Sequence, residues 1–326
     1  MEEFSKEKFY EDILYMFGVI KEHHPNLYYK ISEEELNSLI ENYMKDESID
    51  TLDKSLYYLY GIMVRIGDSH TKLNAYYNPS NYKFKIIDGE CLVSKAMSQE
   101  FLIGAKLTKI NEIPVSKILE EFRNVIVPRT EEGILARVEQ YLANKAMLFV
   151  LPSIYPSTDI EYCFIKDNKE YKYKENVFDI DYSKFQKPKH YEYKVINNIV
   201  YIKYIKCRDM DDYTFKNMIE EIKSIENIDG YIIDIRGNEG GNSEVINPLI
   251  EFLKDKKIVT LVDKYVFSSG IMAYKKLKDL GSTVIGTPIA ETANNFGDVL
   301  HGKTPNYDLE FIYSTKYFTI INNEWI

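Results

Sequence analysis

Residues 230–241 read GYIIDIRGNEGG, and this stretch decides the fold. Its first part, 230–235, is apolar apart from one aspartate and is short enough for a buried strand. Three glycines stand in the five positions 237–241, where they allow the positive backbone φ angles of a tight turn. Apolar residues then recur at helical spacing over 245–253. The stretch therefore predicts a strand, a turn and a helix in succession, which is the repeating unit of a parallel sheet.

The same alternation continues on both sides of this stretch. The flanking segments predict strands at 199–205, 258–262 and 283–285, and helices at 215–225 and 268–280. Short links between such segments are typical of a parallel sheet with helical crossovers. We therefore expect an α/β core over 191–326, with functional groups in the loops at the carboxyl ends of its strands.

The N-terminal region predicts three helices. Apolar residues recur at helical spacing over 9–20, and Pro25 stops that helix. A second helix begins at Ser32, with Glu35 three residues on as a capping box. A third ends at Gly67, a residue suited to close a helix.

Changes of pattern along the chain divide the rest into regions. Residues 1–78 form the helical region, and 79–150 show short strands and a helix, which predicts a small β-rich module. Residues 151–190 predict a hairpin that turns at Asp167, followed by a polar stretch without periodicity at 178–190. We interpret that polar stretch as a linker to the α/β core.

Composition excludes some classes of partner. The chain has 326 residues, a formal net charge of -10 and a pI of about 5.2. This balance argues against a nucleic-acid partner, because phosphate binding needs clustered Lys and Arg. No window approaches the roughly 18 apolar residues of a membrane span, and the N-terminus lacks the pattern of a signal peptide. We therefore expect no membrane partner and a cytoplasmic location.

Cysteine and histidine usage argues against a bound metal. Cys91, Cys163 and Cys207 are widely spaced and form no CxxC pair, so we interpret them as packing residues with free thiols in a reducing compartment. The five histidines lack HExxH spacing. We expect no metal and no cofactor, and nothing in the sequence sets the oligomeric state.

The loop 236–242 (RGNEGGN) is suited to bind an anion. Its glycines let several backbone N–H groups turn toward one point, and such a nest accepts a phosphate or a developing oxyanion. No Lys follows the last glycine, so the loop lacks the Walker pattern of nucleotide-binding proteins. A tight strand-to-helix turn without a ligand is the structural alternative.

A second loop, 265–270 (YVFSSG), stands directly before a predicted helix. Ser268 in this loop can be a nucleophile whose tetrahedral intermediate is held by the following N–H. The alternative is that Ser268 or Ser269 is only the helix N-cap. Since both loops follow neighbouring strands, we expect the amides of Gly240, Gly241 and Ser269 to form an oxyanion hole beside Ser268.

The two loops carry a family resemblance. Residues 234–241 resemble the D-x-R-x-N-x-G-G strand and turn of the tail-specific, or C-terminal processing, serine peptidases, and 267–270 resemble their nucleophile turn. Residues 285–288 resemble the next strand with its G-x-P turn, 67–71 (GDSHT) the GD-x-HT segment, and 104–115 the end of the PDZ-like module. The resemblance implies a core similar to the ClpP/crotonase fold, a PDZ-like module, and hydrolysis of peptide bonds in a peptide or unfolded protein substrate.

The resemblance also implies which residues act. Ser268 takes the position of the nucleophile. Many members use a lysine as the general base, but Thr292 stands at that position here. The chain therefore resembles the Ser–His branch of the tricorn core protease, in which His70 takes the position of the base; a histidine can accept and return a proton near neutral pH. The carboxylate that orients the imidazole is expected to be Asp298 or Glu324.

The other histidines have expected roles of their own. His23 and His24 stand before a proline, where we expect a capping or surface role. His190 lies in the polar linker and is expected to be solvated. His301 and Lys303 follow the last motif and could approach the site.

Two other functions remain open at this point. Ile271, where an acidic residue is common in the family, and Thr292, in place of the family lysine, favour a non-catalytic relative that binds peptides. Acyl-CoA chemistry on a crotonase-like core would use the same oxyanion geometry. Asp68 stands two positions before His70 in the sequence and is expected to point elsewhere.

Overall fold

The computed structural model describes residues 4–74, 77–127, 130–178, 189–289, 291–292 and 294–320. The chain divides into two compact units. The first unit consists of Met1–Pro128, Arg137–Phe185 and Phe296–Tyr317, and the second of Arg129–Ala136, Gln186–Asn295 and Phe318–Ile326. Most of the expected linker, 179–188, lies outside the described residues.

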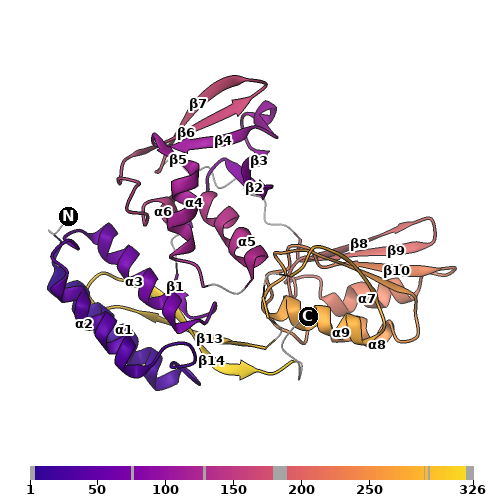
Figure 1. Ribbon diagram of the computed structural model, residues 1–326. Coiled ribbons are helices and arrows are strands. Elements are labelled where there is room, and N and C mark those ends of the chain that lie inside the picture. Colours follow the sequence, from indigo (N-terminus) through magenta and orange to yellow (C-terminus); the bar gives the residue numbers. More distant parts are fainter. Residues whose placement is uncertain are drawn as a thin grey trace. The chain divides into compact units, whose positions relative to one another are not determined.

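Three helices open the first unit, and the sequence predicted all of them. They are α1 (Lys6–His23), α2 (Glu33–Lys45) and α3 (Leu52–Ile66), which lie together in Figure 1. The Ser32 side chain accepts a hydrogen bond from Glu35 N (3.1 Å) and so satisfies a backbone N–H in the first turn of α2. Gly67 ends α3 in the left-handed conformation, with a φ of 75°.

A C-terminal hairpin completes the helical part of the first unit. Strands β13 (Asn295–Lys303) and β14 (Glu310–Phe318) form a sheet with β1 (Lys72–Leu73) in the order β1-β14-β13. Asp12, buried in α1, joins helix and hairpin: its carboxylate accepts hydrogen bonds from Thr304 Oγ1 (2.7 Å) and Tyr307 N (2.8 Å). Figure 1 shows this yellow hairpin beside the indigo helices. These strands fall within 191–326, the range over which the sequence predicts the α/β core, but Phe296–Tyr317 belong to the first unit.

The middle of the chain supplies a six-stranded sheet, in the order β2-β3-β4-β6-β7 with β5 paired to β4. Its strands are β2 (Tyr82–Ile87), β3 (Glu90–Ala96), β4 (Lys106–Ile110), β5 (Ile113–Pro114), β6 (Asp159–Lys166) and β7 (Lys169–Asn176). Asp167 and Asn168 have φ values of 51° and 59°, which suit a two-residue hairpin turn. The predicted hairpin is thus confirmed as β6-β7.

Short helices accompany this sheet. They are η1 (Glu100–Leu102), α4 (Val115–Arg123), α5 (Glu131–Leu142) and α6 (Lys145–Leu148). The sequence pattern over 131–148 predicts a single helix, but the chain leaves the helix after Leu142. Asn144 then starts α6 as its N-cap, because its side chain accepts a hydrogen bond from Ala146 N.

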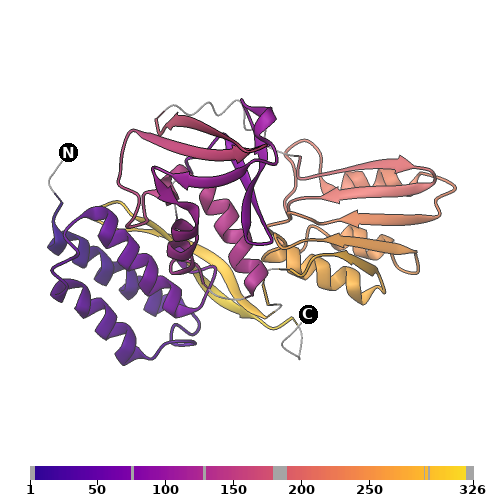
Figure 2. The ribbon, with the colours of Figure 1, turned by 45° about the horizontal axis from the view of Figure 1, so that its top comes forward.

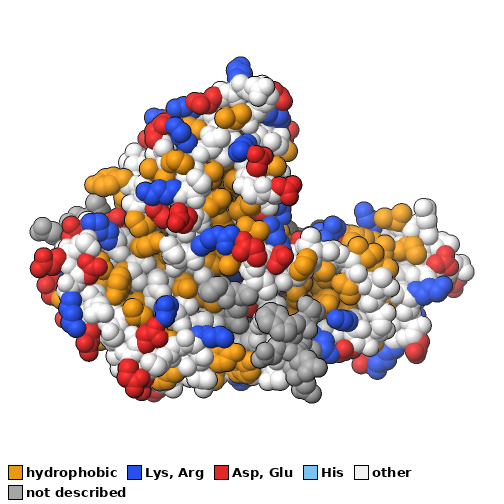
Figure 3. All heavy atoms as spheres, in the orientation of Figure 1, with side chains coloured by type: hydrophobic (Ala, Val, Ile, Leu, Met, Phe, Trp, Pro, Cys, Tyr) orange, Lys and Arg blue, Asp and Glu red, His pale blue; other side chains and the backbone are white. Residues whose placement is uncertain are grey.

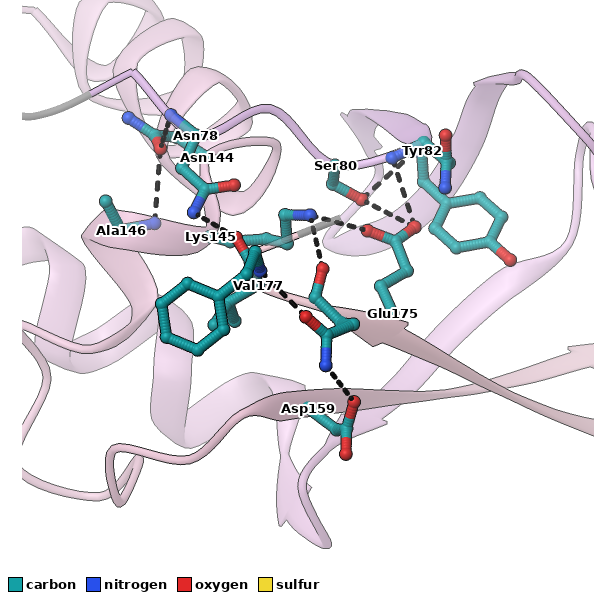
Figure 4. A network of polar contacts seen from close by, with 12 residues as sticks. Asn78, Ser80, Tyr82, Asn144, Lys145, Ala146, Asp159, Glu175 and Val177 are labelled. Carbon is teal, nitrogen blue, oxygen red and sulfur yellow. Dashed lines mark hydrogen bonds and ion pairs between the residues drawn. The ribbon is translucent and has the colours of Figure 1, made fainter. Parts of the chain in front are cut away.

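A buried ion pair fixes α6 to the six-stranded sheet (Figure 4). Lys145 Nζ lies 3.9 Å from the Glu175 carboxylate and donates to the Asn176 carbonyl at 3.1 Å. The Glu175 carboxylate also accepts hydrogen bonds from Ser80 Oγ (3.2 Å) and Asn81 N (3.0 Å). Burial raises the pKa of Glu175, and the Lys145 charge opposes that rise. Since buried charges need partners, these bonds hold α6, β7 and the segment before β2 in one arrangement.

The second unit is the predicted α/β core. Its sheet has the order β12-β11-β10-β9-β8. In chain order the elements are β8 (Tyr191–Ile196), β9 (Ile199–Tyr204), α7 (Phe215–Lys223), β10 (Gly230–Asp234), α8 (Asn247–Phe252), β11 (Ile258–Val262), α9 (Ser269–Asp279) and β12 (Thr283–Gly286). Strands β9 to β12 are parallel, as the alternation predicted. Figure 2 shows the strands of this sheet side by side.

The edge strand β8 was not predicted, and it runs antiparallel to β9. Its sequence, YEYKVI, alternates polar and apolar residues, as expected for a strand with one solvated face. The core beside it packs apolar side chains of the strands against those of α7, α8 and α9, including Ile233, Leu249 and Ile271. Among the helices that the structure describes, none is both long and apolar enough to cross a membrane.

Candidate active site

Two loops meet at the carboxyl edge of the parallel sheet. Because β10 and β11 are parallel neighbours, the loop after Asp234 and the loop after Val262 begin side by side. A backbone bond from Ile235 N to Leu261 O (3.0 Å) continues the pairing past the strand end. Asp263 then links the loops, since its Oδ1 accepts hydrogen bonds from Gly237 N (2.9 Å) and Tyr265 N (3.1 Å). The glycine loop and the serine loop are therefore adjacent, as the sequence predicted.

Ser268 stands in a strained backbone conformation at the start of α9. Its φ is 53° and its ψ is -128°, a region that non-glycine residues rarely adopt and that costs roughly 1–3 kcal/mol. Its side chain makes no capping hydrogen bond to the helix. The N-cap alternative therefore does not account for a serine here. Strain of this kind is typical of a nucleophile held on a sharp strand-to-helix turn.

The glycine loop packs directly against this turn. A Cβ on Gly240 would stand 2.7 Å from Ser268 Cβ and 2.8 Å from Ser269 N, so only glycine fits there. A Cβ on Gly241 would collide with the carbonyl of Cys207. The Ser269 hydroxyl donates to the Gly241 carbonyl at 2.6 Å and ties the second glycine to the first turn of α9.

Of the three backbone amides expected to form the oxyanion hole, one already donates a hydrogen bond within the glycine loop. Gly240 N donates to Asn238 Oδ1 at 2.9 Å, so the oxyanion donor expected at Gly240 is already used within the loop. The amides of Gly241 and Ser269 donate to no other residue in the described part of the chain. Two of the three expected donors thus remain available beside Ser268. Asn238 accepts the hydrogen bond from the third donor, Gly240 N, and it is the asparagine of the D-x-R-x-N-x-G-G motif, to which the sequence assigned no role.

His70 belongs to the first unit, in the loop between α3 and β1. It is 8% exposed, and its backbone N donates to Asp68 Oδ1 at 2.9 Å. The same carboxylate oxygen lies 4.0 Å from His70 Nδ1. The expectation that Asp68 points away from His70 is therefore wrong, because the tight turn after α3 folds the carboxylate back under the imidazole.

Asp68 is a buried hydrogen-bond hub. Its Oδ2 accepts bonds from Thr71 Oγ1 (2.6 Å) and Ser314 Oγ (2.7 Å) and lies 3.2 Å from His24 Nε2. Burial alone would raise the pKa of Asp68, but the hydrogen bonds from His24, Ser314, Thr71 and the His70 backbone outweigh burial and lower it to about 2. Asp68 is therefore a carboxylate anion at neutral pH.

His24 is the second residue of this hub that sequence reasoning missed. The surface role expected for it is wrong, because the side chain is buried against Asp68 and its ring lies 4.7 Å from the Phe296 ring. Its position at the end of α1, as C-cap, agrees with the capping role. His23, its neighbour, makes an edge contact with Tyr313 (5.6 Å).

Of the two carboxylates that the sequence proposes for the third position, the structure describes one. Asp298 is an exposed residue of β13, paired with Lys316 of β14 at 2.7 Å. Glu324 lies outside the described residues. Thr292, at the position of the family lysine, donates to the Asn294 carbonyl at 2.9 Å.

The remaining candidates are exposed or half-buried. Lys303 pairs with Asp308 at 2.9 Å, and His301 is exposed. His190 Nδ1 lies 2.9 Å from the carbonyl oxygen of Arg208.

One group of potential metal ligands occurs in the described residues, remote in sequence from both motifs. Glu112, Glu161 and Cys163 bring ligand atoms within 4.8 Å of one another. Lys172 neutralises this group, 3.1 Å from Glu112 and 3.9 Å from Glu161. Burial raises the pKa of the Cys163 thiol, which keeps it protonated and a poor ligand.

A segment of the second unit matches a known family model. Residues 198–253 match peptidase family S41. The matched segment runs from β9 through the glycine loop to the end of α8. Among curated proteins, no sequence matches this chain closely enough to count as a relative.

The fold is similar to solved structures of CPAF. The crystal structure of mature CPAF is 12% identical, with a TM-score of 0.68 over 95% of this chain and 88% of that one. Mature CPAF complexed with lactacystin is 12% identical, with a TM-score of 0.70 over 95% and 90% of the two chains. The photosystem II D1 C-terminal processing protease is 10% identical, with a TM-score of 0.48 over 97% and 88%. At these identities the likeness to CPAF shows a shared fold.

Proposed function

We propose that this chain is a serine-type peptidase of the S41, or C-terminal processing, family. Its motifs and the matched segment support this premise, from which the roles of the site residues follow. In this proposal Ser268 attacks the carbonyl carbon of a peptide bond, and His70 is the general base that takes the serine proton. The substrates are peptides or unfolded proteins. The five-stranded sheet is a ClpP/crotonase-like core, and the six-stranded sheet is the PDZ-like module.

The backbone of Ser268 carries the proposal. A φ of 53° and a ψ of -128° at a serine need compensation from the surroundings, which the packing of Gly240 against the turn supplies. This turn presents a half-exposed hydroxyl at the N-terminal end of α9, where the helix dipole favours developing negative charge. A merely structural serine would gain nothing from such a conformation.

The tetrahedral intermediate is stabilised by backbone amides. When Ser268 Oγ bonds to the carbonyl carbon, the carbonyl oxygen becomes an oxyanion that accepts hydrogen bonds from Gly241 N and Ser269 N. Each such donor is worth a factor of roughly 10² to 10³ in turnover. The third expected donor, Gly240, supports the loop instead.

His70 completes proton transfer in this proposal. The imidazole accepts the Ser268 proton during attack and returns it to the leaving amine, which leaves an acyl-enzyme that water hydrolyses by the same steps. The Asp68 carboxylate, 4.0 Å from His70 Nδ1, stabilises the imidazolium formed between these steps. The earlier candidates Asp298 and Glu324 stay predictions for the third position.

We also propose a protein substrate and a reducing compartment, and two features accompany this part of the proposal: the surface charges and the cysteines. Acidic and basic side chains are interspersed on the face shown in Figure 3. Cys91, Cys163 and Cys207 are free and buried, as we expected. We place the activity in the cytoplasm, where free thiols persist.

Labelling by a fluorophosphonate tests the nucleophile. The wild-type chain is expected to be labelled and to cleave a peptide library, and Ser268→Ala is expected to lose both. Ser243→Ala, which changes a serine of the same unit in the turn before α8, is the control and keeps both. Full labelling of Ser268→Ala would refute the assignment, and a wild-type chain that binds peptides without cleaving any would favour the non-catalytic relative.

A second pair of variants tests the base. His70→Ala is expected to lower turnover by several orders of magnitude, as loss of a triad histidine does elsewhere. His301→Ala, an exposed histidine of the same unit, is the control and keeps wild-type turnover. If His70→Ala turns over normally, another group is the base, and Lys303 is the next to test.

A further inference from the structure

Asn238 is buried at the centre of the glycine loop and bonded on both ends of its side chain. It has no exposed surface. Its Nδ2 donates to the Tyr204 carbonyl at 2.9 Å, at the end of β9. Its Oδ1 accepts from Gly240 N at 2.9 Å and from Cys207 Sγ at 3.4 Å. The side chain therefore connects the end of one strand with the loop that follows the next.

The backbone of Asn238 also holds the turn that carries the nucleophile. Its carbonyl accepts a hydrogen bond from Phe267 N at 2.9 Å, one residue before Ser268. The same carbonyl packs against Gly270, where a Cβ would stand 2.5 Å from it. One residue thus contacts the glycine loop through its side chain and the serine turn through its main chain.

The Oδ1 bond determines which glycine amide is available. With Gly240 N turned inward to Asn238, the Gly240 carbonyl accepts from Cys207 N at 3.0 Å, and Gly241 takes a φ of 136°. Gly241 N then donates to no other described residue. If Gly240 N were released, the Glu239–Gly240 peptide could rotate and shift the Gly240–Gly241 peptide that carries Gly241 N, because glycines resist rotation weakly.

We propose that Asn238 is a positioning residue, whose Oδ1–Gly240 bond holds the Gly241 amide where the oxyanion forms. This inference rests on the proposed function. Asn238 touches neither substrate nor the reacting atoms, so its loss acts on the transition state through Gly241. A misplaced oxyanion donor lowers turnover by roughly 10² to 10³ and leaves ground-state binding nearly unchanged.

The experiment compares Asn238→Ala with Asn238→Asp and with Asn242→Ala, an exposed asparagine of the same loop. Alanine removes the acceptor for Gly240 N. Aspartate, kept protonated by burial, still accepts from Gly240 N with one oxygen and donates its O–H to the Tyr204 carbonyl with the other. We expect Asn238→Ala to lower kcat by roughly 10² to 10³ with KM within about threefold. A peptide aldehyde, whose adduct with Ser268 places an oxyanion at the same amides, should bind more weakly by a similar factor. Asn238→Asp should retain at least tenfold more kcat than alanine, and Asn242→Ala should match wild type.

Binding to the ground state separates positioning from general damage. Peptide affinity is measured in the Ser268→Ala background with and without Asn238→Ala, and it is expected to be equal. A parallel loss of peptide affinity and kcat would overturn the inference, as would equal losses in the alanine and aspartate variants. Should Asn238→Ala fail to fold, the aspartate variant decides: a loss of kcat smaller than about 10² supports the role of the acceptor, and a loss of about 10² or more overturns it.

These outcomes are distinct from failure of the proposed function. If wild-type turnover does not depend on Ser268, the function itself is wrong. If turnover depends on Ser268 while Asn238→Ala keeps wild-type kcat and aldehyde affinity, only the role of Asn238 is wrong.

Discussion

Gly240 lies so close to Ser268 that a Cβ on the glycine would stand 2.7 Å from the serine Cβ. The two residues belong to loops that follow neighbouring parallel strands, and each constrains the other. The glycine leaves room for the strained serine turn, and the turn leaves no room for any residue larger than glycine.

We expect Gly240→Ala to abolish fluorophosphonate labelling. The new methyl group would meet Ser268 Cβ and Ser269 N, and the φ of 100° is unfavourable for alanine, so the serine turn must shift. Gly237→Ala is the matched control: its φ of 76° is also positive, but a Cβ there meets nothing within 4 Å. It should cost about 1–2 kcal/mol in stability and keep labelling within about threefold. Equal labelling rates in both variants would contradict the close contact.

We expect Ser268→Gly to be inactive but more stable than Ser268→Ala, by about 1 kcal/mol. Glycine adopts the φ of 53° without strain, and this gain exceeds the greater entropy that glycine loses on folding. Urea unfolding of the two variants, followed by circular dichroism, measures the difference. An alanine variant at least as stable as the glycine variant would mean that the turn is relaxed.

We expect the Asp68 hub to weaken in acid. The pKa of Asp68 is about 2 in the folded chain, below its ordinary value of 3.8, so the folded state favours the carboxylate anion. The stabilisation is therefore fully present above pH 4, amounts to about 2 kcal/mol, and is lost as the pH falls from about 4 toward 2. The protection factors for hydrogen exchange, which correct for the intrinsic rate at each pH, should fall over that range in the peptides around 68–72 and 310–318.

Asp68→Asn removes this titration and provides the comparison. The variant should exchange faster than wild type at pH 7, and the difference between the two should shrink as the pH approaches 2. Asp298→Asn, which changes an exposed carboxylate, should leave both peptides unaffected. If the protection of these peptides in the wild-type chain stays constant over that range, the Asp68 carboxylate does not hold the hub together.

The core of the fold and half of the site could be predicted from sequence. Sequence patterns within a few residues were enough where each element depends on its own residues. Apolar runs predicted strands β9 to β12, and the glycines after Asp234 predicted the loop. The parallel order then placed that loop beside Ser268, because the carboxyl ends of neighbouring parallel strands meet at one edge. No knowledge of distant contacts was needed.

The hub around Asp68 could not be predicted, because its members are far apart in the sequence. Ser314 is 246 positions from Asp68 and sits in a strand with no motif of its own. His24 looked like a surface residue because only its neighbours in sequence, a histidine and a proline, could be considered. Burial and partners of such residues arise from tertiary packing, which a periodic pattern does not encode.

The C-terminal hairpin has a consequence for how the protein is made. Asp12 and Asp68 accept hydrogen bonds from Thr304, Tyr307 and Ser314 of the hairpin region. These bonds form only after that region has been synthesised. The five-stranded sheet of the second unit, β8 to β12, ends at Gly286, so all of its strands are made before the hairpin. A nascent chain would therefore hold the whole strand-and-turn segment that carries Ser268 before Ser314 is available to Asp68 beside His70.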